Sequence, residues 1–493
     1  EMSASLVGSE MCIRDRGWVF VPFYTRSMVY TMPEFLERRY NPQSRTILSV
    51  ISLVSYVLTK VAVTVYAGGL VFQQVFGIKE LWGIDFFWIA AIGLVVLTAL
   101  YTIFGGMKSV LYTSVLQTPI LLLGSLIILV LGFKELGGWD EMMRVCGAVT
   151  VNDYGDTMTN LIRSNDDANF PWLGALIGSA IIGFWYWCTD QFIVQRVLSG
   201  KNEMEARRGT IFGAYLKLLP VFLFLIPGMI AFALHQKYIG AGGEGFLPML
   251  ENGTANADAA FPTLVAKLLP AGVKGLVVCG ILAALMSSLA SLFNSSAMLF
   301  TIDFYKRFRP QTSEKKLVGI GQVATVVIVI LGILWIPIMR SVGDVLYTYL
   351  QDVQSVLAPG IAAAFLLGIC WKRTSAQGGM WGLISGMVIG LTRLGAKVYY
   401  SNAGEVADST FKYLFYDMNW LFFCGWMFLF CIIVVIVVSL ATEAPTAEKI
   451  QGLVFGTATK EQKASTRASW NHWDIIHTVI ILAITGAFYW YFW

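Results

Sequence analysis

The chain has few charged residues and few of the groups that perform catalysis or bind metals. Asp, Glu, Lys and Arg make up 13% of its 493 residues, whereas soluble globular domains carry about 25%. The seven cysteines form no C-x-x-C pair and the three histidines are scattered, which argues against a structural metal site. No P-loop, His-Glu-x-x-His motif or nucleophile elbow is present. We therefore expect no ATP-driven transport, no enzymatic activity and no organic cofactor.

Long hydrophobic runs dominate what is present. Hydrophobic residues make up 56% of the chain, and a helix needs ~20 apolar residues to cross a bilayer. Such runs predict an all-α polytopic membrane protein with eleven spans. The expected spans are 46–76, 83–104, 107–133, 171–195, 209–234, 275–300, 317–339, 342–370, 377–399, 420–441 and 473–492. Pro359-Gly360 predicts a kink or break within the 342–370 span.

The basic residues of the loops predict an orientation. One alternate set of loops carries nearly twice as many Lys and Arg residues as the other, so we expect it to face the cytoplasm. This set comprises 37–46, 104–108, 196–210, 301–316, 371–376 and 442–470. The expected location is the plasma (inner) membrane, with the C-terminus outside. The net charge of +4 is small and lies in loops, which argues against nucleic acid as a partner.

The N-terminal residues differ in character from the rest. Residues 1–16 have no apolar core and no signal-peptide layout, and we interpret them as a non-native leader. Residues 17–25 are typical of the last part of a further span. The sequence thus predicts one transmembrane domain over residues 17–493.

A polar and aromatic segment, Trp185–Arg196, interrupts a hydrophobic span. Hydrocarbon offers no hydrogen-bond partners, so this segment requires a protein partner or a hydrated cavity. A glycine beside it, such as Gly183, marks a place where the helix can unwind and expose backbone groups to an ion or substrate. The alternative is an aromatic belt at the membrane interface, since Arg196 is close.

Two lysines within predicted spans are candidate functional residues, because an isolated charge at that depth costs several kcal/mol. Lys217 lies about nine residues beyond Arg208, roughly 13 Å into its span. The alternative for Lys217 is a side chain that reaches back to the interface. Lys60 has either a functional role or a role as a tether between helices, and the sequence names no partner for it.

Further polar residues suggest where a solute and an ion could bind. Ser287 and Ser288 offer hydroxyl oxygens, which suit a bare Na+, although such pairs also pack helices. Gln351 can donate and accept hydrogen bonds, as a sugar hydroxyl requires, or be satisfied by a neighbouring helix. Asp352 and Gln354 share that ambiguity.

Four sequence blocks together resemble the sodium/solute symporter family, and most closely its sodium/glucose cotransporter branch. The resemblance covers nearly the whole chain from about residue 17. The blocks are Thr31–Tyr40, Trp185–Arg196, Leu285–Ser295 with the following Phe300–Tyr305, and Ala363–Arg373.

The resemblance implies an inverted-repeat fold of five plus five helices, with a sodium-coupled site near the membrane midplane. It implies that Tyr186 stacks under the sugar ring as an inner gate with Trp187 beside it, and that Lys217 and Gln351 bind sugar hydroxyls. It further implies that the Ala284 carbonyl, Ser287 and Ser288 supply half of a Na+ site. The expected partners are therefore a small sugar, a sodium ion and the bilayer.

Three departures from the family pattern qualify these expectations. The family carries helices ahead of the first full span seen here, so we expect this fold to lack its first helices and the other half of both sites. Ser114 stands where many relatives have an aspartate, which favours coupling to one sodium ion. Gly183 replaces a hydrogen-bonding residue found in some relatives, which leaves the identity of the sugar open.

The favoured hypothesis is import of a hexose, such as glucose or galactose, driven by sodium through alternating access. The first alternative is a sodium symporter for another small solute, such as inositol, an amino acid or a carboxylate. The second is a membrane module that senses a solute without transporting it. An ion channel is disfavoured because charged rings and repeated filter loops are missing.

Overall fold

The computed structural model describes residues 17–491 except 28, 30, 251–252, 343–344 and 403–406. The proposed leader, residues 1–16, lies outside the described part of the chain. The first half contains α2 (Val21–Ser27), α3 (Met32–Arg39), α4 (Pro42–Ser55), η2 (Tyr56–Val61), α5 (Ala62–Phe76), β1 (Glu80–Leu81), β2 (Ile84–Asp85), α6 (Phe86–Leu136), α7 (Trp139–Gly147), α8 (Trp172–Phe184), η3 (Trp185–Thr189), α9 (Gln191–Leu198), α10 (Glu203–Pro220), η4 (Val221–Leu225) and α11 (Ile226–Gly240).

The second half is also helical. It contains η5 (Ala257–Ala259), α12 (Ala260–Leu268), α13 (Ala271–Met298), η6 (Leu299–Tyr305), α14 (Lys306–Phe308), α15 (Glu314–Val342), α16 (Leu346–Cys370), α17 (Ala376–Asn402), α18 (Thr410–Lys412), η7 (Tyr413–Asp417), α19 (Trp420–Ala441), α20 (Ala447–Ile450), α21 (Lys460–Ala468) and α22 (His472–Tyr491). The short antiparallel pair β1–β2 was not expected from the sequence.

The expected polytopic helical architecture is confirmed. Within the described residues, nine helices are long and apolar enough to cross a membrane. The expected 83–104 span corresponds to a shorter apolar segment, Phe86–Leu100, and the expected 377–399 span corresponds to the glycine-rich helix α17. The loop expected at 104–108 is wrong, because α6 continues through it as one helix of 51 residues. This stretch contains Gly105-Gly106, but no proline or run of polar residues accompanies the pair. The sequence therefore has no strong signal there to end the backbone hydrogen bonds of the helix.

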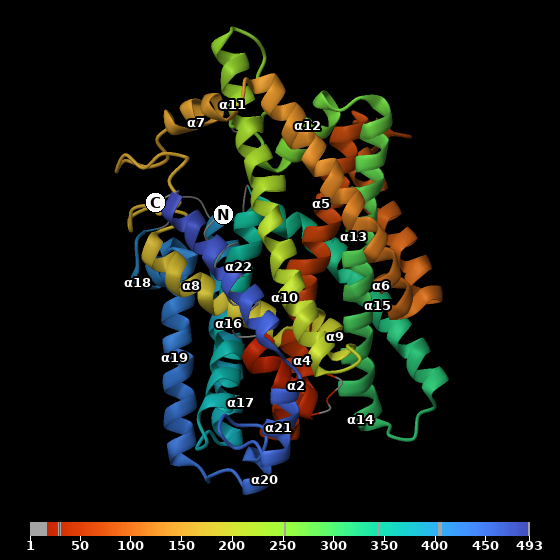
Figure 1. The fold of residues 1–493 in the computed structure, drawn as a ribbon, viewed down its shortest axis with the longest axis vertical. Coiled ribbons are helices and arrows are strands. Elements are labelled where there is room, and N and C mark those ends of the chain that lie inside the picture. Colours follow the sequence, from red (N-terminus) through yellow and green to blue (C-terminus); the bar gives the residue numbers. More distant parts are fainter. Residues whose placement is uncertain are drawn as a thin grey trace.

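Helix α16 forms the centre of one half of the molecule. It packs against α8, α17 and α19 (Figure 1), and 83% of its most apolar 18-residue window is buried. Of the kink or break expected at Pro359, the break is wrong, because α16 is continuous through this residue. At the next residue, Gly360, α16 meets Gly386 of α17 so closely that a Cβ on Gly386 would lie 2.6 Å from the Gly360 Cα.

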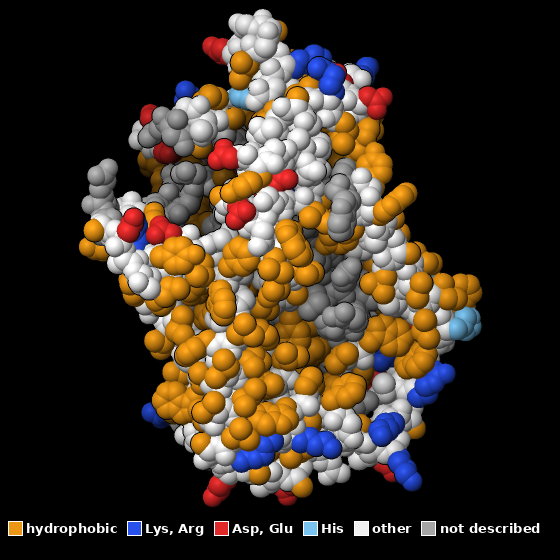
Figure 2. All heavy atoms as spheres, turned by 90° about the vertical axis from the view of Figure 1, so that its left-hand side faces the viewer, with side chains coloured by type: hydrophobic (Ala, Val, Ile, Leu, Met, Phe, Trp, Pro, Cys, Tyr) orange, Lys and Arg blue, Asp and Glu red, His pale blue; other side chains and the backbone are white. Residues whose placement is uncertain are grey.

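Helices α6, α13 and α15 lie on the other side of the molecule (Figure 1), with α13 packed against both of the others. The expected cytoplasmic loops that contain α14, α20 and α21 lie at the same end of the fold, opposite α7. Hydrophobic side chains cover the middle of the face in Figure 2, and several Lys and Arg side chains gather below them. This pattern is typical of a protein surrounded by lipid at mid-height.

The Gly360–Gly386 contact yields a prediction about stability. Gly386→Ala should lower the free energy of unfolding by about 1–3 kcal/mol, because the added methyl forces α16 and α17 apart. The measurement is thermal unfolding of the purified protein in detergent. Gly395→Ala on the same helix is the matched control, since a Cβ there meets nothing within 4 Å. Equal unfolding of the two variants would contradict this packing.

Candidate functional site

The polar segment predicted at Trp185–Arg196 is where a transmembrane helix breaks. Helix α8 passes into the wide π-helical turns of η3, and Asp190 then takes an extended conformation with φ −75° and ψ 123° before α9 begins. The Asp190 amide donates to the Trp185 carbonyl at 3.0 Å, which closes the last wide turn. The transmembrane helix is therefore discontinuous within this segment.

The break lies later than the glycines suggested. It falls at Asp190, not beside Gly183, so the prediction of unwinding at the glycine is wrong. The glycines of α8 instead allow close helix packing: a Cβ on Gly178 would lie 2.8 Å from the Leu421 carbonyl oxygen of α19. Asp190 breaks the helix because its carboxylate caps α9, accepting from the Phe192 amide at 3.2 Å.

A neighbouring helix satisfies the groups exposed by this break. The Tyr56 hydroxyl donates to Asp190 Oδ1 at 3.0 Å and accepts from the Phe192 amide at 3.0 Å. The Lys60 ammonium donates to Asp190 Oδ2. Tyr56 and Lys60 both belong to η2, so a second π-helical segment meets the first at the ion pair. Such segments are rare and are often found at functional sites.

Lys60 thus has the partner that the sequence did not name. Its side chain is 9% exposed and that of Asp190 is 2% exposed. Aromatic rings surround the ammonium, which lies 4.4 Å from the Phe192 ring centroid and 5.2 Å from that of Tyr186. The ion pair that joins η2 to the start of α9 therefore also contacts Tyr186, the predicted gate residue. A buried lysine inside a span needs a carboxylate, and Asp190 is one of few within the predicted spans, so the sequence offered Asp190 as a candidate without showing the pairing.

Three of the four predicted sugar-binding residues lie together. The Tyr186 and Trp187 rings meet edge to face, with centroids 5.1 Å apart. The Lys217 ammonium, from α10, lies 3.8 Å from the centroid of the Trp187 ring. All three side chains are partly exposed, so they can reach a ligand.

The fourth predicted residue, Gln351, lies on α16, which packs against η3. Its amide donates to the Tyr347 hydroxyl of the same helix at 2.8 Å. The structure therefore does not join Gln351 directly to the other three. Its neighbour Asp352 accepts from Lys397 of α17, and Arg393 lies 3.6 Å away, so Asp352 makes an ion pair between helices.

The predicted sodium ligands, Ala284, Ser287 and Ser288, share one face of α13 because they are three and four residues apart on a continuous helix. The Ser287 side chain is buried, whereas Ser288 is exposed and Ala284 partly exposed. Oxygens of this kind can hold a sodium ion only if further oxygens complete the shell. The side chain of Ser114, which bears on the number of ions, lies outside the described residues.

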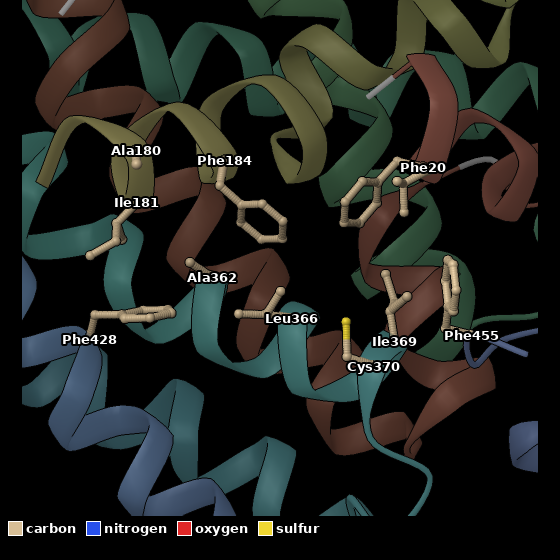
Figure 3. A pocket seen from close by; sticks show the side chains of 11 residues that line it. Phe20, Ala180, Ile181, Phe184, Ala362, Leu366, Ile369, Cys370, Phe428 and Phe455 are labelled. Atoms are coloured by element: carbon tan, nitrogen blue, oxygen red, sulfur yellow. The ribbon is translucent and has the colours of Figure 1, made fainter. Parts of the chain in front are cut away.

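An apolar pocket of about 440 Å³ lies close to the break but has a different character. Phe20, Phe184, Leu366 and Phe428 project into it from separate segments of the chain (Figure 3). None of the predicted sugar-binding residues lines it. A sugar needs hydrogen-bond partners for its hydroxyl groups, so we do not assign this pocket to the sugar.

Comparisons with known proteins connect this geometry to a family. The model for the sodium:solute symporter family matches residues 11–386. The bovine sodium/mannose cotransporter SLC5A10 is 36% identical, over 96% of this chain and 82% of its own. The human sodium/myo-inositol cotransporter 2 is 36% identical over 89% of this chain, and the sheep sodium/glucose cotransporter 1 is 38% identical over 87%. The chain spans 66% of the length of each of these two relatives.

A solved structure shows the same fold. A Na+-coupled sialic acid symporter, in its substrate-bound outward-open state, superposes with a TM-score of 0.67. The alignment covers 90% of this chain and 84% of the symporter, at 21% sequence identity. The fold class predicted from the sequence, that of the sodium symporters, is confirmed.

The Lys60–Asp190 pair yields a second stability prediction. Lys60→Met should lower the free energy of unfolding by about 3–5 kcal/mol, because it leaves a buried carboxylate without its cation. The double variant Lys60→Met/Asp190→Asn should recover most of this loss, since asparagine keeps the helix cap and carries no charge. Unfolding in detergent measures both.

The control for this pair is Lys79→Met, an exposed lysine beyond the end of α5. A double variant less stable than Lys60→Met alone would show that the charge pair does not set the stability of this contact.

Proposed function

Because the chain belongs to the sodium:solute symporter family, we propose that it imports a monosaccharide by sodium-coupled symport. The cargo is an uncharged hexose such as glucose or galactose, and alternating access moves it across the plasma membrane. The loops rich in Lys and Arg face the cytoplasm in this proposal, and the C-terminus lies outside. The names of the relatives, which include glucose and mannose cotransporters, support a sugar as the cargo.

The cluster of Tyr186, Trp187 and Lys217 beside the helix break carries this proposal. It combines aromatic faces, which suit the apolar face of a sugar ring, with an ammonium that can donate to hydroxyl groups. The ammonium lies over the Trp187 ring, so the donor and the aromatic faces are presented to a ligand side by side. Tyr186 serves as the inner gate, and Gln351 approaches the sugar when α16 and η3 close around it.

Sodium coupling requires an ion site whose occupancy depends on the conformation of the carrier. In our proposal the Ala284 carbonyl and the Ser287 and Ser288 hydroxyls form half of this site. One charge that moves inward through 100 mV supplies ~2.3 kcal/mol, to which the sodium gradient adds. Import follows if sodium binds the outward-open state more tightly than the inward-open state, because only differential affinity shifts a population.

myo-Inositol is a second candidate cargo. The human relative is named a myo-inositol cotransporter, and inositol shares the ring shape and the hydroxyl pattern of a hexose. The same cluster suits either, since both present hydroxyl groups to the Lys217 ammonium and a ring to the aromatic side chains.

Uptake by cells that express the protein tests the function. We expect labelled hexoses to enter in sodium medium and to enter at background rate when choline replaces sodium. The panel should contain glucose, galactose, mannose, myo-inositol and one amino acid. Sodium-dependent uptake of inositol alone would replace the hexose with inositol, and no sodium-dependent uptake of any member would overturn the proposal.

Lys217→Ala tests the sugar site. The substitution removes a charged hydrogen-bond donor, so the KM for sugar should rise roughly tenfold or more. The sodium concentration for half-maximal uptake should change less, because the proposed sodium ligands lie on α13. Lys201→Ala, in the exposed turn before α10, is the control. Unchanged uptake kinetics in Lys217→Ala would remove this residue from the site.

A further inference from the structure

One buried serine connects the proposed sodium half-site to the helix that follows the gate. Ser291 lies on α13, one turn beyond Ser287, and its side chain is fully buried. Its hydroxyl donates to the Ser287 carbonyl oxygen at 2.9 Å. This bond fixes the backbone of a residue that the proposed function assigns to sodium.

The same serine is held by α9. The Arg196 guanidinium donates to the Ser291 hydroxyl at 2.6 Å, and the Gln195 amide donates to the Ser291 carbonyl at 3.2 Å. Helix α9 starts at the break, four residues after Trp187 and directly after Asp190. Both groups that donate to Ser291 therefore belong to the helix that directly follows the gate and the break.

We propose that Ser291 is a positioning residue that couples sodium binding to the gate, through Arg196 and Gln195 of α9. The inference rests on the proposed function, since it concerns the same two sites. Sodium that orders the Ser287 turn also orders the Ser291 hydroxyl. This hydroxyl then holds α9, and with it the break at Asp190, in the arrangement that binds sugar.

The geometry gives this route a physical basis. A hydrogen bond to a charged donor is stronger than one between neutral groups, and the Ser291 hydroxyl acts as acceptor from Arg196 and donor to Ser287 at once. Removing it leaves the Ser287 carbonyl without this donor and the α9 guanidinium without this acceptor. Coupling between two ligands is reciprocal, so the loss must be visible in the affinity of either one.

The test measures the KM for labelled glucose, or the fastest-transported hexose of the panel, at low and at high sodium. The wild-type KM should fall as sodium rises. In Ser291→Ala the ratio of the two KM values should approach one, a loss on the order of fivefold or more. Ser291→Thr keeps the hydroxyl and should restore most of the ratio.

Ser295→Ala is the matched control. Ser295 is as buried as Ser291, lies one turn further along α13, and donates to the Ser291 carbonyl at 2.8 Å. No hydrogen bond from the described part of α9 reaches its hydroxyl. The KM ratio should stay at its wild-type value in this variant, and an equal loss would show that α13 packing in general is responsible and would overturn the proposal.

Arg196→Met provides an independent arm, because the Arg196 side chain is exposed and its loss does not open the core. This variant should lose the sodium dependence as Ser291→Ala does, and the double variant should be no worse than either. A wild-type ratio in either single variant, or effects that multiply in the double variant, would overturn the coupling role. A wild-type protein without sodium-dependent uptake would instead overturn the proposed function, before any substitution is made.

Discussion

The structure depends on the need to satisfy every polar group where a helix is interrupted inside the membrane. At Asp190, which is buried, the chain leaves helical geometry, and unpaired backbone groups within a membrane would cost several kcal/mol each. The carboxylate meets this need in three ways, because it caps α9, accepts from Tyr56 and pairs with Lys60. Replacing Asp190 would take this partner from Tyr56, Lys60 and the Phe192 amide at once, so the break and its neighbour form one unit.

Sequence patterns predicted the parts of the fold that depend on apolar length and composition. The spans follow from runs of ~20 hydrophobic residues, and α16, α19 and α22 begin and end close to the expected positions. The errors came from local signals with more than one meaning. Gly105-Gly106 reads as a turn but is accommodated within α6, and Pro359 reads as a break although α16 continues through it. Both signals are compatible with a continuous helix as well as with the end of one.

The site was predictable in its composition but not in its pairings. The segment Trp185–Arg196 was recognisable because it is polar inside a predicted transmembrane span. The charges of Lys60 and Lys217 were recognisable for the same reason. The sequence could not join Lys60 to Asp190, since 130 positions separate them and only the tertiary fold brings η2 beside η3. The sequence also did not show that the break lies at Asp190, because both Gly183 and the capping carboxylate of Asp190 are residues at which a helix can end.

The two wide-turn segments η2 and η3 carry a mechanical consequence. An α-helix advances 100° per residue, so one residue gained or lost within a wide turn swings every later side chain by about that angle while most of the backbone ladder survives. Lys60 and Tyr56 lie inside one such segment, and Asp190 directly follows the other. If one residue passed from a π-helical turn into a normal α-helical turn, the rotation alone would separate Lys60 from Asp190. The reverse change would bring the two side chains together again. The fold thus holds a pivot that needs neither a flexible loop nor the unfolding of a helix.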